Sequence, residues 1–257
     1  MKAMILAAGL GTRLRPLTND RPKALVTVGD QTLLEIALAR LRSFGVTEVI
    51  VNAHHFAELI VAYLEAHHNF GLRITVSHEP ELLDTGGGLK LAAPFFLEST
   101  QTDPFIVHNV DVFSDLDLGR MIEFHRQQNA LATLAVQQRT SSRQLLFDDV
   151  GQLCGRRVIA SSKTGETKVE DDQWVRPVAH TQALAFTGIH VLSSRIFDKL
   201  KEQGAFSIIS SYLRLAGEGE KIVAYRADAC NWRDLGRPES ILAATEEMAN
   251  GMYHELL

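Results

Sequence analysis

The sequence has little cysteine, no long apolar run and no surplus of positive charge. Its two cysteines, Cys154 and Cys230, lie far apart and outside any Cys-x-x-Cys spacing, so we expect reduced thiols rather than a disulfide. The formal net charge of −5 at pH 7 gives no support for nucleic-acid binding through a basic face. The apolar run at residues 3–7 is too short for a signal peptide or a membrane span, so we expect a cytoplasmic protein with no membrane partner.

The composition is otherwise that of an ordinary globular protein. Hydrophobic residues make up 46% and charged residues 22% of the 257 positions, which is enough to bury a large core. The chain shows no internal repeat, no low-complexity segment and no long linker. We therefore predict one domain over residues 1–257, with a change of character near residue 141.

Strand-like and helix-like segments alternate in the first half of the chain. The strand candidates are apolar and rich in β-branched residues, as buried parallel strands are. Thr32 and Glu35 form a capping box at the start of the first predicted helix. The alternation predicts an α/β fold with a doubly wound, Rossmann-like, mostly parallel sheet. We expect strands at residues 2–7, 48–53, 72–78, 104–109 and 131–137, and helices at residues 33–44, 56–67, 87–97 and 117–128.

The second half of the chain has a different pattern. A polar stretch at residues 160–172 separates short strand-like segments, and we interpret it as an exposed hairpin or a flexible loop. This region therefore predicts a small β insert in the domain. Around it we expect strands at residues 144–148, 153–159, 184–191 and 221–225, and helices at residues 194–202, 208–216 and 238–249.

A loop of small residues follows the first predicted strand, and two cations, Arg13 and Lys23, follow the loop. A loop with little side-chain bulk exposes backbone N–H groups to an anion, and the cations add charge. It is not a Walker loop, since no Gly-Lys-Ser/Thr follows, and Leu14 stands where the dinucleotide fingerprint needs its third glycine. The pattern predicts a phosphate-binding site at the end of a strand. The small residues are Ala8, Gly9, Gly11 and Thr12.

Asp111 is a candidate functional acid because it comes directly after the predicted strand at residues 104–109. Open α/β sheets bind their ligands at this edge. The alternative is a helix cap or a turn residue, the roles that we expect for the nearby Asp115 and Asp117. Asp234, in a Trp-x-Asp-x-Gly segment, is a second candidate.

Three consecutive glycines, residues 86–88, follow Thr85 and open a predicted helix. Such a run offers free N–H groups and lets a flat ring approach the backbone closely. A plain tight turn is the alternative, and it explains three glycines in a row poorly. Residues 186–190, Phe-Thr-Gly-Ile-His, similarly read either as a strand with a kink at Gly188 or as part of a binding pocket.

Residues 6–25 resemble the signature G-x-G-T-R-x-x-P-L-T…P-K of sugar-1-phosphate nucleotidyltransferases, and the similarity extends from Met1 to about Ala244. The resemblance implies a reaction in which a nucleoside triphosphate and a sugar 1-phosphate give an NDP-sugar and pyrophosphate, with Mg²⁺ as cofactor. It further implies a nucleotide-binding half at residues 1–140 and a sugar-phosphate-binding half, with the β insert, at residues 141–257. The matching positions are Gly9, Gly11, Thr12, Arg13, Pro16, Leu17, Thr18, Pro22 and Lys23.

The resemblance also implies roles for individual residues. Arg13 would hold the departing phosphates, and Lys23 would bridge the α-phosphate and the incoming sugar phosphate. Asp111 and Asp234 match the two aspartates that bind Mg²⁺ in the family. We expect the nucleotide to contact Ala8, Gly9, Gly11, Thr12, Arg13, Lys23, Thr85, Gly86, Gly87 and Gly88, and the sugar phosphate to contact Asn109, Thr187, Gly188 and Arg176.

The chain departs from the family on the sugar-binding side. Many members carry a second lysine there within Glu-Lys-Pro, and this tripeptide is absent from the sequence. Arg176, which precedes Pro177, is our expected substitute, and Arg156 and Arg157 are the alternatives. An arginine changes the phosphate contact, because its planar guanidinium binds phosphate in a bidentate manner.

The substrates are suggested by the Asp-Thr-Gly-Gly-Gly segment at residues 84–88 and by the compact chain. Both resemble the N-acetylmuramate 1-phosphate uridylyltransferases and the short mannose-1-phosphate guanylyltransferase-like members of the family. We favour UTP with N-acetylmuramate 1-phosphate or a similar amino-sugar phosphate. The alternatives are GTP with mannose 1-phosphate, CTP with a non-sugar phosphate, and a non-catalytic nucleotide or sugar-phosphate sensor. The sequence does not indicate the oligomeric state.

Overall fold

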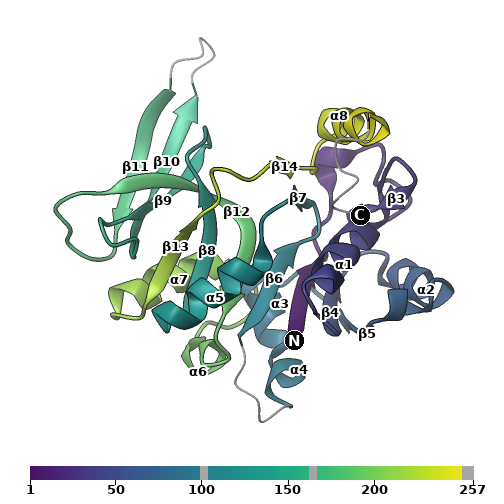
Figure 1. Cartoon of the computed structure of the whole chain (residues 1–257), viewed down its shortest axis with the longest axis horizontal. Helices are drawn as coiled ribbons and strands as arrows, with labels where there is room; N and C mark the ends of the chain where they lie inside the picture. Colours follow the sequence, from purple (N-terminus) through teal and green to yellow (C-terminus); the bar gives the residue numbers. More distant parts are fainter. Residues whose placement is uncertain (99–103, 162–166, 251–257) are drawn as a thin grey trace.

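A ten-stranded mixed sheet runs through the protein (Figure 1). The computed structural model describes residues 1–98, 104–161 and 167–250. The strands lie in the order β11-β10-β9-β12-β6-β1-β4-β5. Off this path, β8 pairs antiparallel with β12, and β13 pairs in parallel with β8. The strands of this sheet are β1 (Lys2–Leu6), β4 (Glu48–Ala53), β5 (Arg73–His78), β6 (Phe105–Asn109), β8 (Ala132–Gln137), β9 (Arg143–Phe147), β10 (Leu153–Ser161), β11 (Thr167–Trp174), β12 (Gln182–Leu192) and β13 (Ile222–Arg226).

The N-terminal part of the sheet is parallel and is covered on both faces. β1 pairs in parallel with β4 and β6, and β4 pairs in parallel with β5. Ala3 and Ile5 pack in one buried cluster with α1, α2 and α5, whereas Met4 and Leu6 pack in another with α3, α4 and α7. The doubly wound α/β prediction is therefore confirmed. The helices are α1 (Leu33–Ser43), α2 (Ala57–Ala66), α3 (Asp84–Leu91), α4 (Ala93–Leu97), α5 (Leu118–Gln128), α6 (Ile196–Lys199), α7 (Ile208–Gly217) and α8 (Pro238–Ala249).

The helix boundaries follow from local chemistry. The Thr32 hydroxyl accepts a hydrogen bond from the Glu35 N–H at 3.1 Å, so the predicted cap of α1 is confirmed. The prediction of a single helix at residues 87–97 is wrong, because Pro94 lies in the first turn of a second helix and has no N–H to continue the first. Within the described ranges, none of the helices combines the length and apolar character needed to span a bilayer.

β12 marks the change from a parallel to an antiparallel sheet. It pairs antiparallel with β6, β8 and β9, and β9, β10 and β11 continue as an antiparallel ribbon on the left of Figure 1. Of the polar stretch at residues 160–172, residues 167–172 belong to β11, so the hairpin interpretation is confirmed for these residues. Residues 162–166 lie outside the described residues.

Two short strand pairs are present that the sequence does not predict. One joins β2 (Thr27–Val28) to β3 (Gln31–Thr32), and the other joins β7 (Val112–Ser114) to β14 (Trp232–Asp234). Strands of two or three residues are too short to show a periodicity. The second pair places Asp234 opposite Val112 and therefore beside Asp111. It brings together residues from the two halves of the chain.

Candidate active site

A cavity of about 470 Å³ lies at the carboxyl ends of β1, β4 and β6. Open α/β sheets bind their ligands at this edge. The cavity contains side chains from the small-residue loop, from the ends of the three strands and from the start of α3. Its lining residues are Leu6, Ala8, Gly9, Arg13, Lys23, Asn52, Leu82, Asp84, Thr85, Asn109, Asp111 and Ala205.

Gly11 allows the small-residue loop to fold back on Lys23. Its φ of 62° lies in the left-handed region, and a Cβ there would lie 3.0 Å from the Thr18 methyl group and 3.1 Å from the Lys23 Cβ. The Thr18 hydroxyl donates to the Gly11 carbonyl at 2.9 Å and closes the loop. The signature residues therefore shape the loop as well as supplying charge.

Lys23 and Asp111 form an ion pair at the floor of the cavity. The Lys23 Nζ lies 3.0 Å from the Asp111 Oδ2, and the two side chains are only 14% and 12% exposed. Burial raises the pKa of Asp111, but the charge and hydrogen bond of Lys23, with a backbone hydrogen bond and the charge of Arg13, outweigh burial and hold the pKa below its ordinary value. Asp111 is therefore ionised at neutral pH.

Arg13 and Asp234 form a second, more exposed pair. Their charged atoms lie 3.5 Å apart, with side-chain exposures of 56% and 42%, so the pair itself stabilises the fold little. The Asp234 Oδ1 accepts from the Gly236 N–H at 2.8 Å, and the Leu235 N–H donates to the Asp111 carbonyl at 2.8 Å. These bonds tie the two aspartate segments together and place two carboxylates and two cations at one edge of the sheet.

Asp111 and Asp234 are suitable ligands for Mg²⁺. Among the described residues, no three histidine, cysteine or acidic side chains are grouped as a metal site. Mg²⁺ does not need such a cage, since it usually binds through one or two carboxylates and completes its shell with water and substrate phosphates. The oxygen donors present therefore fit a hard divalent cation better than zinc.

A buried carboxylate that the sequence analysis missed, Glu79, organises the neighbouring wall of the cavity. It is fully buried, and its two oxygens accept from the Asn52 amide at 2.6 Å and from the Leu83 N–H at 3.0 Å. The Asn52 oxygen in turn accepts from the Ala7 N–H at 2.7 Å. The network fixes the end of β1 against the segment before α3. In the sequence, this network is indicated only by the positions of Asn52, near the end of one predicted strand, and Glu79, directly after the next.

We expect Glu79→Gln to destabilise the protein by about 1–3 kcal/mol, because the new amide group places a donor against one of the two existing donors. Urea unfolding measured without ligand tests this expectation. Glu81→Gln is the matched control, since Glu81 is exposed and lies in the same segment. Equal stability of the two variants would contradict the structural role of Glu79.

The three glycines of α3 are buried against the protein rather than open to the cavity. A Cβ on Gly86 would lie 2.3 Å from the Phe206 ring, and one on Gly87 would lie 2.6 Å from the Gly204 carbonyl. A Cβ on Gly88 would lie 2.5 Å from the Glu79 carboxylate. The Gly86 N–H already donates to the Phe206 carbonyl at 2.9 Å. Packing thus accounts for the glycines, and Thr85 and Asp84 face the cavity in their place.

Gly86→Ala is expected to lower the stability of the ligand-free protein by about 1–3 kcal/mol, because Phe206 must move to admit the methyl group. Thermal unfolding without nucleotide measures this effect. If Gly86→Ala were as stable as the parent but bound the nucleotide more weakly, the result would instead support a direct contact between Gly86 and the nucleobase.

The residues expected at the sugar phosphate are placed unevenly. Asn109 lines the cavity, and a Cβ on Gly188, whose φ is +87°, would lie 2.7 Å from the Asn109 amide nitrogen. The Thr187 hydroxyl donates within the sheet to the Ala135 carbonyl at 2.9 Å. Arg176 does not join them, because its guanidinium pairs with Asp148 and donates to the Leu153 carbonyl at 3.0 Å.

Of the alternatives to Arg176, Arg157 pairs with Asp172 at 2.7 Å. The Arg156 Nε is buried without a partner in the described structure. Neither side chain lines the cavity at the strand ends. None of the three arginines therefore lines the cavity in place of the missing Glu-Lys-Pro lysine, as the sequence analysis expected of one of them.

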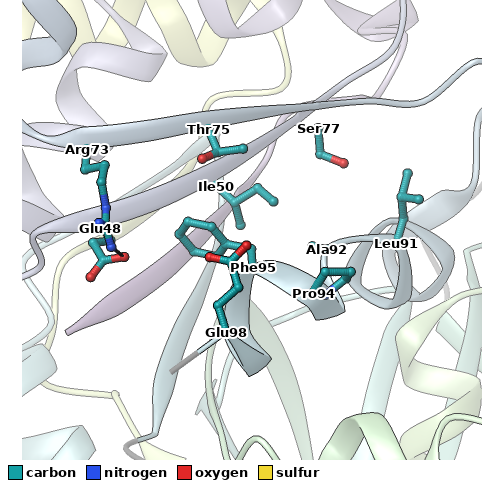
Figure 2. A pocket seen from close by; sticks show the side chains of 10 residues that line it. All are labelled: Glu48, Ile50, Arg73, Thr75, Ser77, Leu91, Ala92, Pro94, Phe95 and Glu98. Carbon is teal, nitrogen blue, oxygen red and sulfur yellow. Dashed lines mark hydrogen bonds and ion pairs between the residues drawn. The ribbon is translucent and has the colours of Figure 1, made fainter. Parts of the chain in front are cut away.

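A separate cavity of about 390 Å³ lies under β4, β5 and α4 (Figure 2). Figure 2 shows Arg73 beside Glu48, with which it forms an ion pair, and Thr75 and Ser77 follow on the same face of β5. This cavity shares no lining residue with the one at the strand ends. Its one cation among the described residues, Arg73, is paired with Glu48, and Glu98 adds a second carboxylate to its lining, so it shows no preference for an anionic ligand.

The sequence matches the family described as nucleotidyl transferase over residues 2–145. It is 34% identical over 256 residues to the N-acetylmuramate alpha-1-phosphate uridylyltransferase of Caulobacter vibrioides, and the match covers 96% of each chain. It is 28% identical to the probable mannose-1-phosphate guanylyltransferase 1 of Oryza sativa, over 94% of this chain and 63% of that protein.

Solved structures show the same fold at low identity. A UDP-glucose pyrophosphorylase complexed with UDP-glucose superimposes with a TM-score of 0.73 at 17% identity, covering 97% of this chain and 98% of the other. HddC from Yersinia pseudotuberculosis, complexed with GMP-PN, gives a TM-score of 0.67 at 23% identity, covering 96% and 99%.

Proposed function

Because the chain belongs to the nucleotidyl transferase family, we propose that it joins a nucleoside triphosphate to a sugar 1-phosphate, giving an NDP-sugar and pyrophosphate. The observation that carries the proposal is the pair of ion pairs at the strand ends, Lys23–Asp111 and Arg13–Asp234. Two cations can receive phosphates, and two carboxylates can hold a divalent cation. A protein that only binds a nucleotide has no evident need for both carboxylates.

The reaction needs positioning and charge more than proton transfer. An oxygen of the sugar phosphate, already ionised near neutral pH, attacks the α-phosphorus in line. The bond between the α-phosphorus and the oxygen that bridges to the β-phosphate breaks, and pyrophosphate leaves. Lys23 holds the α-phosphate beside the incoming phosphate, and Arg13 neutralises the departing pyrophosphate. Positioning two reactants in this way contributes on the order of 7–11 kcal/mol in well-oriented systems, and fixed charges contribute further.

Asp111 and Asp234 would hold Mg²⁺, which when bound polarises phosphate oxygens and offsets their charge. The lowered pKa of Asp111 supports this role, because the carboxylate stays ionised and ready to bind a cation at neutral pH. Ala8, Gly9 and Thr85 line the cavity where the nucleoside would lie.

For the substrates we propose UTP and N-acetylmuramate 1-phosphate or a similar amino-sugar phosphate. The 34% identity to the Caulobacter uridylyltransferase over nearly all of both chains supports this choice. GTP with mannose 1-phosphate is the second candidate, supported by the 28% identity to the rice protein. The rice relative is longer, since this chain spans 63% of its length.

Pyrophosphate release tests the proposal. The purified protein is assayed with Mg²⁺ against UTP, GTP, CTP, ATP and dTTP, each combined with the 1-phosphates of N-acetylmuramate, N-acetylglucosamine, mannose and glucose. We expect release with UTP and an amino-sugar phosphate. Release with GTP and mannose 1-phosphate would replace the substrate assignment but keep the reaction. Nucleotide binding without release in any combination would favour a sensor or a non-sugar acceptor.

A further inference from the structure

A third hollow, of about 520 Å³, opens where the two halves of the chain meet, near residue 140. It lies between the loop that joins β8 to β9 and the faces of β9, β10 and β12. Most of its lining side chains are polar and uncharged, and one is a cation. The lining residues are Gln138, Arg139, Thr140, Ser141, Ser142, Gln144, Ile159 and Ala183.

Arg139, the cation of this hollow, is half-buried and has no carboxylate partner. Its guanidinium donates to the Phe186 carbonyl at 3.0 Å and stacks 3.8 Å from the centre of the Trp232 ring. Its Nε is buried without a hydrogen-bond partner, and no described carboxylate lies within ion-pair distance. By contrast, Arg157 and Arg176 each pair with an aspartate.

Burial disfavours this unpaired charge. It lowers the pKa of Arg139, and Asp234 compensates only in part from a distance. A half-buried cation with unused donors is stabilised when an anion binds, because the anion supplies both charge and acceptors. A residue needed only to cap the Phe186 carbonyl would not have to be charged.

Arg139 is also connected to the candidate active site. The Trp232 ring on which it stacks donates its Nε1–H to the Thr187 carbonyl at 2.8 Å. Trp232 belongs to β14, which also carries Asp234. Gly188, next to Thr187, packs against Asn109 at the wall of the cavity. Arg139 is thus linked to the cavity wall through Trp232 and through the Thr187–Gly188 segment of β12.

We propose that Arg139 binds an anionic group of the acceptor substrate and thereby determines which sugar phosphates this chain accepts. The inference rests on the proposed function, since it assumes that an acceptor substrate reaches this hollow. The group is an oxyanion suited to a planar guanidinium, either the phosphate of the acceptor or a carboxylate on its sugar.

The first test compares Michaelis constants for the acceptor and for the nucleotide. We expect Arg139→Gln, which keeps a donor for the Phe186 carbonyl, to raise KM for the acceptor by about 10- to 100-fold. KM for the nucleotide should stay within about twofold of the parent, and Arg139→Lys should recover part of the loss. Arg143→Ala is the matched control, because Arg143 is exposed and lies four residues further along the chain, at the start of β9, outside the lining of the hollow. An unchanged KM for the acceptor in Arg139→Gln would overturn the proposal.

Two acceptors distinguish the phosphate from the carboxylate. N-acetylmuramate 1-phosphate carries a carboxylate that N-acetylglucosamine 1-phosphate lacks. A loss confined to the muramate compound identifies the carboxylate as the group bound by Arg139. An equal loss for both acceptors identifies the phosphate. Either result supports an anion contact at Arg139.

A binding measurement separates failure of this inference from failure of the proposed function. Trp174→Phe leaves Trp232 as the single tryptophan, and its fluorescence is titrated with inorganic phosphate and with both acceptors. We expect a saturable change that Arg139→Gln abolishes and Arg143→Ala retains. If no substrate pair reacts but this change is present, the proposed function fails and the anion site stands. Absence of a saturable change in the folded protein would overturn the anion site, whatever the activity.

Discussion

Asp111→Asn is expected to lower turnover by about 100- to 1000-fold, because it removes the charge of one of the two carboxylates that would hold the divalent cation. The substitution keeps the shape of the side chain, and its amide oxygen can still accept from Lys23. The fold should therefore survive. Pyrophosphate release at saturating substrates measures the effect, and a Mg²⁺ activation curve should shift to higher concentration.

Asp149→Asn is the matched control for this substitution. Asp149 is exposed and lies on the turn between β9 and β10, and its substitution by Asn removes the same negative charge from the protein. Its turnover and Mg²⁺ dependence should equal those of the parent. Parental turnover and an unshifted Mg²⁺ curve in Asp111→Asn would show that Asp111 is not a metal ligand.

Lys23→Met is expected to have two separate effects. Turnover should fall by about 100- to 1000-fold, because the cation that joins the two reacting phosphates is lost. The ligand-free protein should also lose about 3 kcal/mol of stability at neutral pH, because the Asp111 carboxylate remains buried without its partner. Lys23→Arg retains the charge and should restore most of the stability. It should restore less of the turnover, because the planar guanidinium of arginine places its hydrogen-bond donors differently from the compact lysine ammonium group.

The stability effect of Lys23→Met should depend on pH in a defined direction. Lys23 holds the pKa of folded Asp111 below its ordinary value of 3.8, against the effect of burial. The pair therefore stabilises the folded state above this value, and its contribution is lost as the pH falls through the lowered pKa. In the variant burial raises the Asp111 pKa unopposed by Lys23, so its carboxylate takes up a proton at a higher pH than in the parent. The difference in urea unfolding between parent and variant should therefore begin to narrow above about pH 4 and continue to narrow as the pH falls through the lowered pKa of the parent. A difference that stays constant there would mean that the lysine acts through packing alone.

Local patterns predict much of this protein. The β-branched apolar segments predict the parallel strands, and Thr32 with Glu35 predicts the start of α1, because backbone periodicity and capping depend on neighbouring residues. The small residues, Arg13 and Lys23 after the first strand likewise predict a phosphate loop. The cavity lies where that loop meets the strand ends.

Positions that depend on distant contacts are not predictable from such patterns. The helix prediction at residues 87–97 fails at Pro94, and the glycines before it prove to be packed against Phe206 and Gly204, which lie more than a hundred residues along the chain. The sequence shows that these glycines are unusual. It does not show which atoms occupy the space beside them.

The sequence by itself determined the class of fold and the family, because both depend on short segments whose pattern does not require distant contacts. Only the tertiary structure decided that Asp234 lies beside Asp111, through the short pairing of β14 with β7. It also decided that Arg176 is engaged by Asp148 while Arg139 keeps an unpaired charge in a hollow. Whether an arginine is free depends on the carboxylates that folding brings near it, and that is a property of long-range packing rather than of the residues beside it.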